Sequence, residues 1–292
     1  MSKKFKQIIV KAPAKINVYL GVTGKRPDGY HDIDSVMQTV GVYDILKISV
    51  REDSCAQNIT VHCPGHAELD GEANIAYRAA VAFLKRAAID KYDIDIEIDK
   101  VIPMEAGIGG GSSDAAAVIS ALNELYSAHF ELSELMEIGA TVGADVPFLI
   151  HKGTAFVQGI GEKIVPCRNM PKATVLLAYP YSEKVSTGKA YGAIDEKGDF
   201  TPTERFEEMK NAIEMSNMGM IAKAAYNIFE TVIPEESVIF KIKNAMLERG
   251  AEFSLMSGSG SAVFGIFLEA AKACEAAKAL DEIAKTFVTE FC

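Results

Sequence analysis

The sequence predicts an α+β protein made of two subdomains. Strand patterns dominate the first half of the 292 residues and helix patterns the second, an order typical of α+β folds and not of a repeating β–α–β series. Hydrophobic residues make up 49% and charged residues 24% of the chain, as in ordinary globular proteins. Single cores usually stop growing near about 250 to 300 residues, so this length favours two subdomains.

The first half contains five predicted strands. The clearest lies where Ile alternates with Asp and Glu, a period of two that buries one face of a sheet. The others are short runs rich in Ile and Val. The predicted strands are Ile8–Ala12, Ile16–Val22, Ile45–Val50, Ile59–Cys63 and Asp93–Asp99.

Three helices interrupt or follow these strands. Apolar residues recur at helical spacing in Asn74–Ala88 and Asp114–Ala128. A third, short helix follows Ser133, a plausible N-cap, and ends near Gly143.

The second half is mainly helical. A Gly-rich strand pair around Gly153–Val165 is the expected seam, so we expect one domain over residues 1–163 and another over residues 164–292. The predicted helices are Thr203–Met215, Met220–Phe229, Pro234–Arg249 and Ala270–Val288, and the predicted strands are Val175–Tyr179 and Val263–Phe267.

Charge and hydropathy narrow the class of partner. The formal net charge of -10 argues against nucleic acid and anionic lipid as partners, although a small anion can bind locally. The longest uncharged stretch, Phe253–Leu268, is broken by Ser and Gly and is too short for a membrane span. Only Ile8–Val10 are consecutive apolar residues near the amino terminus, so we expect no signal peptide and a cytoplasmic location.

The cysteines predict neither a disulfide framework nor a zinc site, because they are odd in number and form no Cys-x-x-Cys pair. His62, Cys63 and His66 come nearest to a metal-ligand cluster, but Pro64 and Gly65 make this stretch read as a strand ending in a turn. The five cysteines are Cys55, Cys63, Cys167, Cys274 and Cys292.

A glycine-rich loop, residues 102–116, is the motif that carries chemistry. Four glycines within five positions allow close backbone approach to a ligand, and the following helix offers unpaired N–H groups and a positive dipole end. Ser112 and Ser113 add hydroxyl groups. The pattern favours phosphate binding over a plain flexible loop, and it matches neither a Walker loop nor the dinucleotide fingerprint.

This loop, at Pro103–Ala116, resembles the second signature of the GHMP kinase superfamily. Ala12–Asn17 resembles the first signature and Ser257–Gly265 the third, each in its expected place. The resemblance implies a two-lobed fold with a ribosomal protein S5 domain 2-like N-terminal lobe and a ferredoxin-like C-terminal lobe. Glu105 and Ser261 depart from the usual pattern, the first by its charge near the phosphates and the second by replacing a frequent Pro.

The resemblance also implies ATP and Mg²⁺ as cofactors. The metal ligands stay open, with Ser113 as a candidate. Asn74 and Lys100 would surround adenine, although a helix cap and a solvated strand end are their plain structural alternatives. The residues implied for the phosphates are Pro103, Met104, Glu105, Ala106, Gly107, Ile108, Gly109, Gly110, Gly111, Ser112, Ser113 and Asp114.

Two further stretches, Gly24–His31 and Gly143–Phe148, resemble one branch of the superfamily, which phosphorylates a hydroxyl of a cytidine-diphosphate substrate in the non-mevalonate route to isoprenoids. By this resemblance Tyr30 and Tyr191 would stack on cytosine and His31 would hydrogen-bond its edge. The polyol or diphosphate part would lie against two further residues, Asn17 and Thr187.

Two charged residues are the implied catalytic pair. Asp145 would take the proton from the attacking hydroxyl, and Lys15 would stabilise the ionised carboxylate and the developing alkoxide. Their structural alternatives are a helix or turn cap and a solvated strand-edge lysine. Another acceptor, such as homoserine or a sugar, and a non-catalytic nucleotide-binding protein remain alternative functions, and both monomer and homodimer stay open.

Overall fold

The computed structural model describes residues 5–51 and 56–292, so Cys55 lies outside the described residues. Contacts divide the chain into two compact units, which we describe separately. The first holds the described part of residues 1–14, 43–104 and 109–151. The second holds Lys15–Val42, Glu105–Ile108 and Lys152–Cys292. Because the two units interleave along the chain, the domain boundary at residue 163 stays a prediction.

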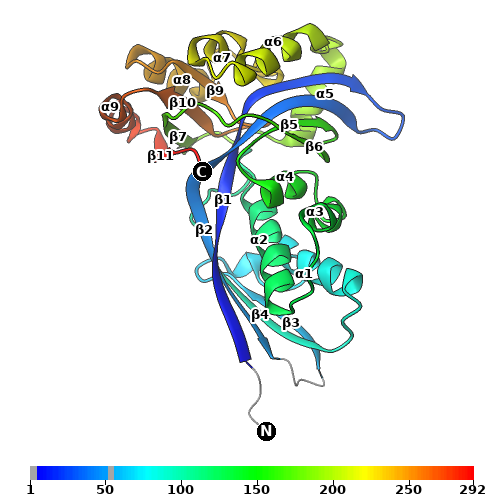
Figure 1. Ribbon diagram of the computed structural model, residues 1–292. Coiled ribbons are helices and arrows are strands. Elements are labelled where there is room, and N and C mark those ends of the chain that lie inside the picture. Colours follow the sequence, from blue (N-terminus) through cyan, green and yellow to red (C-terminus); the bar gives the residue numbers. More distant parts are fainter. Residues whose placement is uncertain (1–4, 52–55) are drawn as a thin grey trace. The chain divides into compact units, whose positions relative to one another are not determined.

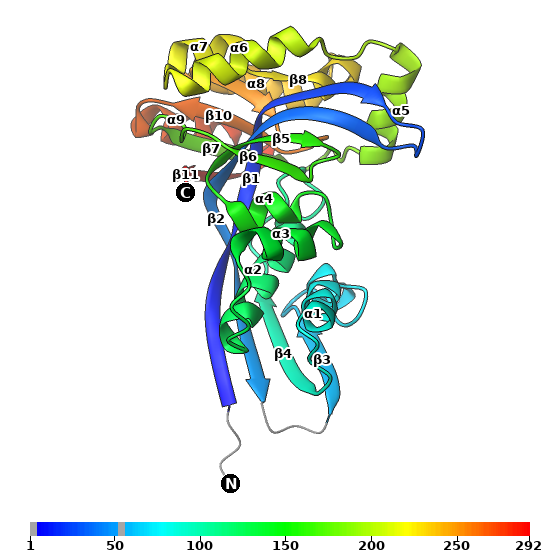
Figure 2. The ribbon, with the colours of Figure 1, turned by 45° about the vertical axis from the view of Figure 1, so that its right-hand side comes forward.

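The first unit is a sheet with helices on one face (Figures 1 and 2). The strand order is β3-β4-β2-β1, with β3 parallel to β4 and β4 antiparallel to β2. Two of these strands, β1 and β2, continue into the second unit. The elements are β1 (Phe5–Lys25), β2 (His31–Arg51), β3 (Gln57–His62), η1 (Ala67–Leu69), α1 (Ile75–Arg86), β4 (Tyr92–Asp99), α2 (Gly110–Leu125), α3 (Leu132–Ala140) and α4 (Val146–His151).

Strand β4 confirms the predicted one-sided burial. Ile94, Ile96 and Ile98 are fully buried, whereas Asp95 and Glu97 are exposed on the opposite face. Alternation of this kind fixes the register, because a slip of one residue would bring the acidic side chains into the core.

The second unit contains the ferredoxin-like fold. Its antiparallel sheet has the order β11-β7-β10-β9, and α8 and α9 pack against it, which gives a β–α–β–β–α–β arrangement. The elements are β5 (Thr154–Gly159), β6 (Lys163–Pro166), β7 (Thr174–Pro180), α5 (Thr187–Lys197), α6 (Thr203–Glu214), α7 (Met218–Ala224), β8 (Tyr226–Asn227), η2 (Ile228–Val232), α8 (Val238–Glu248), β9 (Phe253–Met256), β10 (Val263–Phe267), α9 (Ala270–Leu280) and β11 (Ala284–Glu290).

Two predicted helices are too long. The helix predicted over Ala270–Val288 ends at Leu280, and β11 then pairs with β7 along the edge of the sheet. The helix predicted over Met220–Phe229 ends at Ala224, and the next residues pair with β1 before a turn of 3-10 helix. In both segments sheet pairing with distant residues overrides local helical spacing, which a periodicity argument does not include.

The other differences are elements that the sequence did not predict and a helix cap assigned to the wrong residue. Strand β1 runs without a break across Pro13, β2 begins at His31 and not near Ile45, and α4, α5 and β9 were not predicted. The short helix α3 is capped by Glu131 in a reciprocal box with Glu134, so Ser133 is not its cap. The Gly-rich strand pair is confirmed as β5 and β6.

A buried ion cluster ties together both ends of the glycine-rich loop. The ammonium of Lys100, at the end of β4, lies 2.6 Å from a carboxylate oxygen of Asp44 and 2.7 Å from one of Asp114 in α2. The second oxygen of Asp44 accepts the N–H groups of Val101 and Ile102, at 2.6 and 2.8 Å. Asp44 is fully buried, and this one ion pair and two backbone hydrogen bonds replace the water that its carboxylate loses on burial.

The cluster holds two carboxylates against one ammonium. Burial raises the pKa of Asp114 to about 8; the nearby Lys100 opposes this shift and Asp44 adds to it. Burial acts to lower the pKa of Lys100, but the two carboxylates outweigh it and raise that pKa. The cluster therefore approaches neutrality at neutral pH when Asp114 holds a proton.

We expect Asp44→Ala to lower the free energy of unfolding by about 3 to 5 kcal/mol, because it leaves two buried backbone N–H groups without an acceptor and removes one of the two carboxylates that pair with the Lys100 ammonium. Glu207→Ala is the control, since Glu207 is exposed and pairs with Lys210 on the surface of α6. Its cost should be below about 1 kcal/mol. Urea unfolding measures both, and equal losses would contradict the role of Asp44.

Asp114 also predicts a pH dependence of stability. Its folded pKa lies above the unfolded value, so the folded state retains a proton that the unfolded state releases. Its contribution is full below the unfolded pKa and is lost as pH rises through the folded pKa, by at most about 1.4 kcal/mol per pH unit. Between about pH 5 and about pH 8, wild-type protein should lose more unfolding free energy than Asp114→Asn. Equal pH slopes would contradict this.

Candidate active site

The glycine-rich loop joins β4 to α2, and its second half opens α2 in the first unit. Gly109 adopts a left-handed conformation with φ 74°, which glycine tolerates well, and the helix begins at the next residue. The first N–H groups of a helix lack partners within it, so those of Gly110, Gly111 and Ser112 can receive an anion. The buried Ser113 hydroxyl donates to a β1 carbonyl 2.7 Å away.

The tip of the loop, Glu105–Ile108, belongs to the second unit, where the carbonyl groups of Ala106, Gly107 and Ile108 each accept a hydrogen bond. Within the described residues, the N–H groups of Ala106–Gly109 donate to no protein acceptor, so the loop has unpaired backbone donors. The donors to the carbonyls are the Ala262 N–H (3.0 Å to Ala106), the Ser257 hydroxyl (3.0 Å to Gly107) and the Lys15 N–H (2.9 Å to Ile108).

Gly107 is required by this packing. Its φ is +76°, and a Cβ atom built on it would lie 2.2 Å from the Ser257 carbonyl oxygen. No side chain fits there. The loop thus packs against residues of both other resembling signatures, and the structure brings the three motifs together.

A cavity of about 380 Å³ lies beside this tip, between the loop and the start of α5. The Thr187 hydroxyl, at the first residue of α5, lies 2.8 Å from the Ser259 hydroxyl. Glu105 is exposed and its carboxylate lies 3.6 Å from the Lys184 ammonium, so its charge near the cavity is partly offset. The lining residues are Glu105, Gly107, Lys184, Val185, Ser186, Thr187 and Gly260.

Lys15 is not a solvated strand-edge residue, since it is only 4% exposed. Its ammonium donates to the Asn17 side-chain oxygen at 2.7 Å, and the Asn17 amide donates to the Ser35 hydroxyl at 2.9 Å. The Ser35 hydroxyl in turn donates to the Tyr19 carbonyl at 2.6 Å, which completes this series of hydrogen bonds. Lys15 and Asn17 therefore belong to one buried polar network, which holds both side chains in fixed positions.

The predicted base-binding residues fall into two groups. His31 and Tyr191 stack with ring centroids 4.6 Å apart. Tyr30 lies in the turn before β2 and is 60% exposed, with its N–H bonded to the Asp28 carboxylate at 3.1 Å. Among the described residues, the aromatic ring contacts of His31 and Tyr191 do not include Tyr30. The predicted loop-tip position is confirmed for Tyr30, while His31 has a half-buried place at the start of β2.

Asp195 and Lys25 join this group. The His31 Nε2 atom lies 2.7 Å from one Asp195 oxygen, and the Lys25 ammonium donates to the other at 2.6 Å. Hydrogen bonds from Lys25 and then His31 hold the pKa of Asp195 below its usual range, so it is a carboxylate at neutral pH.

Asp145 directly precedes α4 in the first unit, and its carbonyl accepts the Leu149 N–H at 3.1 Å. The same segment passes close to the start of α2, because a Cβ atom at Gly143 would lie 3.9 Å from the Ser112 hydroxyl oxygen. The Gly143–Phe148 stretch therefore lies next to the start of α2, which is part of the glycine-rich loop.

Asn74 and Lys100 have structural partners. The Asn74 side chain accepts the Ala76 N–H at 2.9 Å as the N-cap of α1 and donates to the Leu69 carbonyl at 2.8 Å. Lys100 is held in the buried ion cluster and is not a solvated strand end. Contact of either residue with adenine stays a prediction.

The described residues contain no set of three His, Cys, Asp or Glu side chains placed to hold a metal ion. The Ser113 hydroxyl is engaged with a carbonyl and is 1% exposed. His62 pairs with Asp70 and His66 with Glu68, in agreement with the strand-and-turn interpretation of that stretch.

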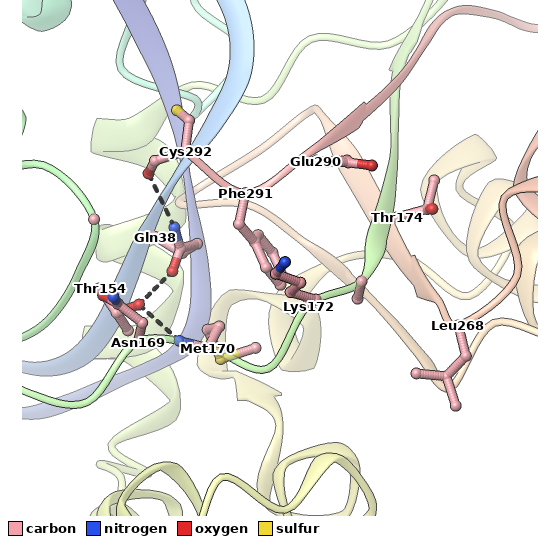
Figure 3. A pocket seen from close by; sticks show the side chains of 12 residues that line it. Gln38, Thr154, Asn169, Met170, Lys172, Thr174, Leu268, Glu290, Phe291 and Cys292 are labelled. Carbon is pink, nitrogen blue, oxygen red and sulfur yellow. Dashed lines mark hydrogen bonds between the residues drawn. The ribbon is translucent and has the colours of Figure 1, made fainter.

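Two larger cavities contain none of the predicted site residues. One, of about 660 Å³, lies by the end of β11, where Gln38 bonds to the Cys292 carbonyl and accepts the Thr154 hydroxyl (Figure 3). The other, of about 840 Å³, lies between α1 and α3. Of the predicted site residues, Glu105, Gly107 and Thr187 line the smaller cavity of about 380 Å³.

Asp44, Asp195 and Lys25 were missed by sequence reasoning. The sequence does point to Asp44, because it lies between Tyr43 and Ile45 in an apolar run, where burying a carboxylate costs free energy unless it has a partner. Asp195 lies four residues after Tyr191, on the same face of α5, but that helix was not predicted.

The family models for GHMP kinases match two segments of the chain. The N-terminal domain model matches residues 74–153 and the C-terminal model residues 204–286. Among the described residues, no helix has the length and apolar character needed to cross a membrane.

Curated relatives named 4-diphosphocytidyl-2-C-methyl-D-erythritol kinase are similar over almost the whole chain. The protein of Caldicellulosiruptor bescii is 41% identical, covering 96% of this chain and 95% of its own, and that of Caldicellulosiruptor saccharolyticus is 42% identical, covering 97% and 94%.

Solved structures agree. A crystal structure of 4-(cytidine 5'-diphospho)-2C-methyl-D-erythritol kinase superposes with a TM-score of 0.79 at 31% identity, covering 97% of this chain and 99% of its own. Homoserine kinase from Cytophaga hutchinsonii, at 20% identity and a TM-score of 0.77 with coverages of 99% and 96%, shares the fold. The chain therefore belongs to the GHMP kinases, and within them to the 4-diphosphocytidyl-2-C-methyl-D-erythritol kinase family.

Proposed function

We propose that this protein transfers the γ-phosphoryl group of ATP to the 2-hydroxyl of 4-diphosphocytidyl-2-C-methyl-D-erythritol, which yields the 2-phosphate and ADP for isoprenoid precursor synthesis. The observation that carries the proposal is the 41 to 42% identity to kinases of that name over nearly the full length. Homoserine and mevalonate kinases share the fold at 20% identity or less, which supports no choice of acceptor.

The ATP phosphates would lie on the glycine-rich loop. The unpaired N–H groups of Ala106–Gly109 and the first turn of α2 supply donors for phosphate oxygens, and Lys184 offsets Glu105 beside them. This mode of binding needs no basic surface, which suits a chain of formal charge -10.

Mg²⁺ would be held mainly by the phosphates and water. Since no ready cluster of ligands exists in the described residues, the protein would contribute at most a few oxygen atoms. When bound, the ion neutralises charge on the phosphoryl oxygens during transfer.

Asp145 would accept the proton of the 2-hydroxyl as that oxygen forms its bond to the γ-phosphorus. The bond from this phosphorus to the bridging oxygen breaks at the same time, and its electrons leave with ADP. The Lys15 ammonium would stabilise negative charge on the attacking oxygen, and its bond to Asn17 holds it in place.

The cytidine end of the acceptor would lie against the aromatic pair of His31 and Tyr191, with Tyr30 closing over it from its exposed turn. Flat rings with polar edges suit a pyrimidine base. Asn17 and Thr187 would contact the remaining polyol and diphosphate, with Thr187 lining the 380 Å³ cavity.

A cytoplasmic location, a monomeric or homodimeric state and a domain boundary at residue 163 are part of the proposal. The thiols of Cys63, Cys167, Cys274 and Cys292 are free, which fits a reducing compartment.

The direct test is a coupled assay of ADP release with ATP, Mg²⁺ and the cytidine-diphosphate acceptor. We expect ADP and the 2-phosphate in equal amounts. Homoserine and galactose serve as competing acceptors. ADP at the rate of background hydrolysis would reject the proposal, and equal turnover of homoserine would favour a different acceptor.

Asp145→Asn should lower kcat by about 10²- to 10⁴-fold, because it removes the base and leaves the phosphate loop intact. ATP affinity, measured by calorimetry, should be nearly unchanged. Asp90→Asn is the control, since Asp90 is exposed and its hydrogen bond within the described part of the chain is through its backbone carbonyl. Turnover within about tenfold of wild type would show that another group acts as the base.

A further inference from the structure

The ring pair of His31 and Tyr191 is part of a larger arrangement on one face of α5, which lies beside the β1–β2 hairpin (Figures 1 and 2). Tyr191 and Asp195 are four residues apart and share this face. The first contacts the face of the His31 ring, while the second bonds to its Nε2 atom at 2.7 Å. One helix turn therefore fixes both the orientation of the imidazole and its hydrogen bonding.

Asp195 has a defined charge and a defined orientation. One of its oxygens accepts the Lys25 ammonium at 2.6 Å, which leaves the other for His31. An ionised carboxylate can only accept hydrogen bonds. The neutral His31 ring must therefore carry its proton on Nε2, and Nδ1 must hold a lone pair.

Within the described residues, Nδ1 of His31 has no donor bonded to it. The side chain is 8% exposed, so a lone pair there is a poorly hydrated acceptor that a ligand can satisfy. Cytosine offers an amino donor at position 4, whereas uracil presents a carbonyl acceptor at the same place. A lone pair attracts the first and repels the second.

We propose that Asp195, itself oriented by Lys25, is the positioning residue that makes this site select cytosine over uracil, by holding His31 as the Nε2–H tautomer. This inference rests on the proposed function, because it takes the cytidine group to bind at His31. It adds two residues, Asp195 and Lys25, to the acceptor site.

The isosteric variant Asp195→Asn gives an unusual expectation. Lys25 still needs an acceptor, so the amide oxygen turns toward it and the amide nitrogen faces His31. Nε2 must then accept, the proton moves to Nδ1, and Nδ1 becomes a donor that suits the uracil carbonyl. Asp195→Ala removes both interactions and leaves the tautomer unconstrained.

The test measures calorimetric binding of cytidine diphosphate and uridine diphosphate to the full chain. Wild-type protein should prefer cytidine diphosphate by about tenfold or more, the effect of roughly one hydrogen bond. Asp195→Asn should reverse the preference, and Asp195→Ala should bring the ratio near one. Asp199→Asn, which neutralises an exposed carboxylate just beyond the same helix, should keep the wild-type ratio.

A spectroscopic readout separates positioning from structural damage. In ¹⁵N-histidine spectra, with His31→Gln used for assignment, wild-type His31 should appear as the Nε2–H tautomer and Asp195→Asn as the Nδ1–H tautomer. In kinetics, the variant should raise KM for the cytidine acceptor and leave KM for ATP unchanged.

Three results would overturn the inference: an Nδ1–H tautomer in wild type, an unchanged ratio in folded Asp195→Asn, or an unchanged ratio in Asp195→Ala. Wild-type protein that binds neither diphosphate would reject the proposed function itself, so the two failures are distinguishable. Circular dichroism melting shows whether each variant is folded.

Discussion

A single buried ammonium group organises the part of the first unit that holds the glycine-rich loop. Lys100 lies between Asp44 and Asp114 and so joins the end of β4, the middle of β2 and the N-terminal part of α2. None of these groups can separate without leaving an uncompensated buried charge, which costs several kcal/mol. The ends of the glycine-rich loop are therefore held in place, although its glycines make the chain between them intrinsically flexible.

The tip of the same loop is held by hydrogen bonds in the second unit. Its three carbonyl groups accept donors from the first and third signatures, so that its N–H groups are the polar atoms left for a ligand. Gly107 permits this because no Cβ fits against the Ser257 carbonyl. Anion binding by backbone N–H groups also reconciles a net charge of -10 with polyphosphate substrates.

The residues predicted to bind the acceptor are positioned differently, because each side chain is held in place by other side chains. The Lys15, Asn17 and Ser35 chain is buried and continuous, and His31 is fixed by Tyr191 and Asp195 on one face of α5. Such networks rigidify a site only when each donor and acceptor has a partner. The residues predicted to bind the base and those predicted to bind phosphate are thus held in place by separate sets of interactions.

The amino-acid sequence was sufficient for the α+β class, the alternating strand β4, the helices α1 and α2 and the three signature motifs, because these follow from local periodicity and glycine spacing. It misplaced the ends of α7 and α9, where pairing with distant strands overrides helical spacing. The partners of Lys100 and His31 are Asp44 and Asp195, 56 and 164 residues away in the chain. Only folding brings such residues to hydrogen-bond distance, so burial and pairing could not be read from sequence order.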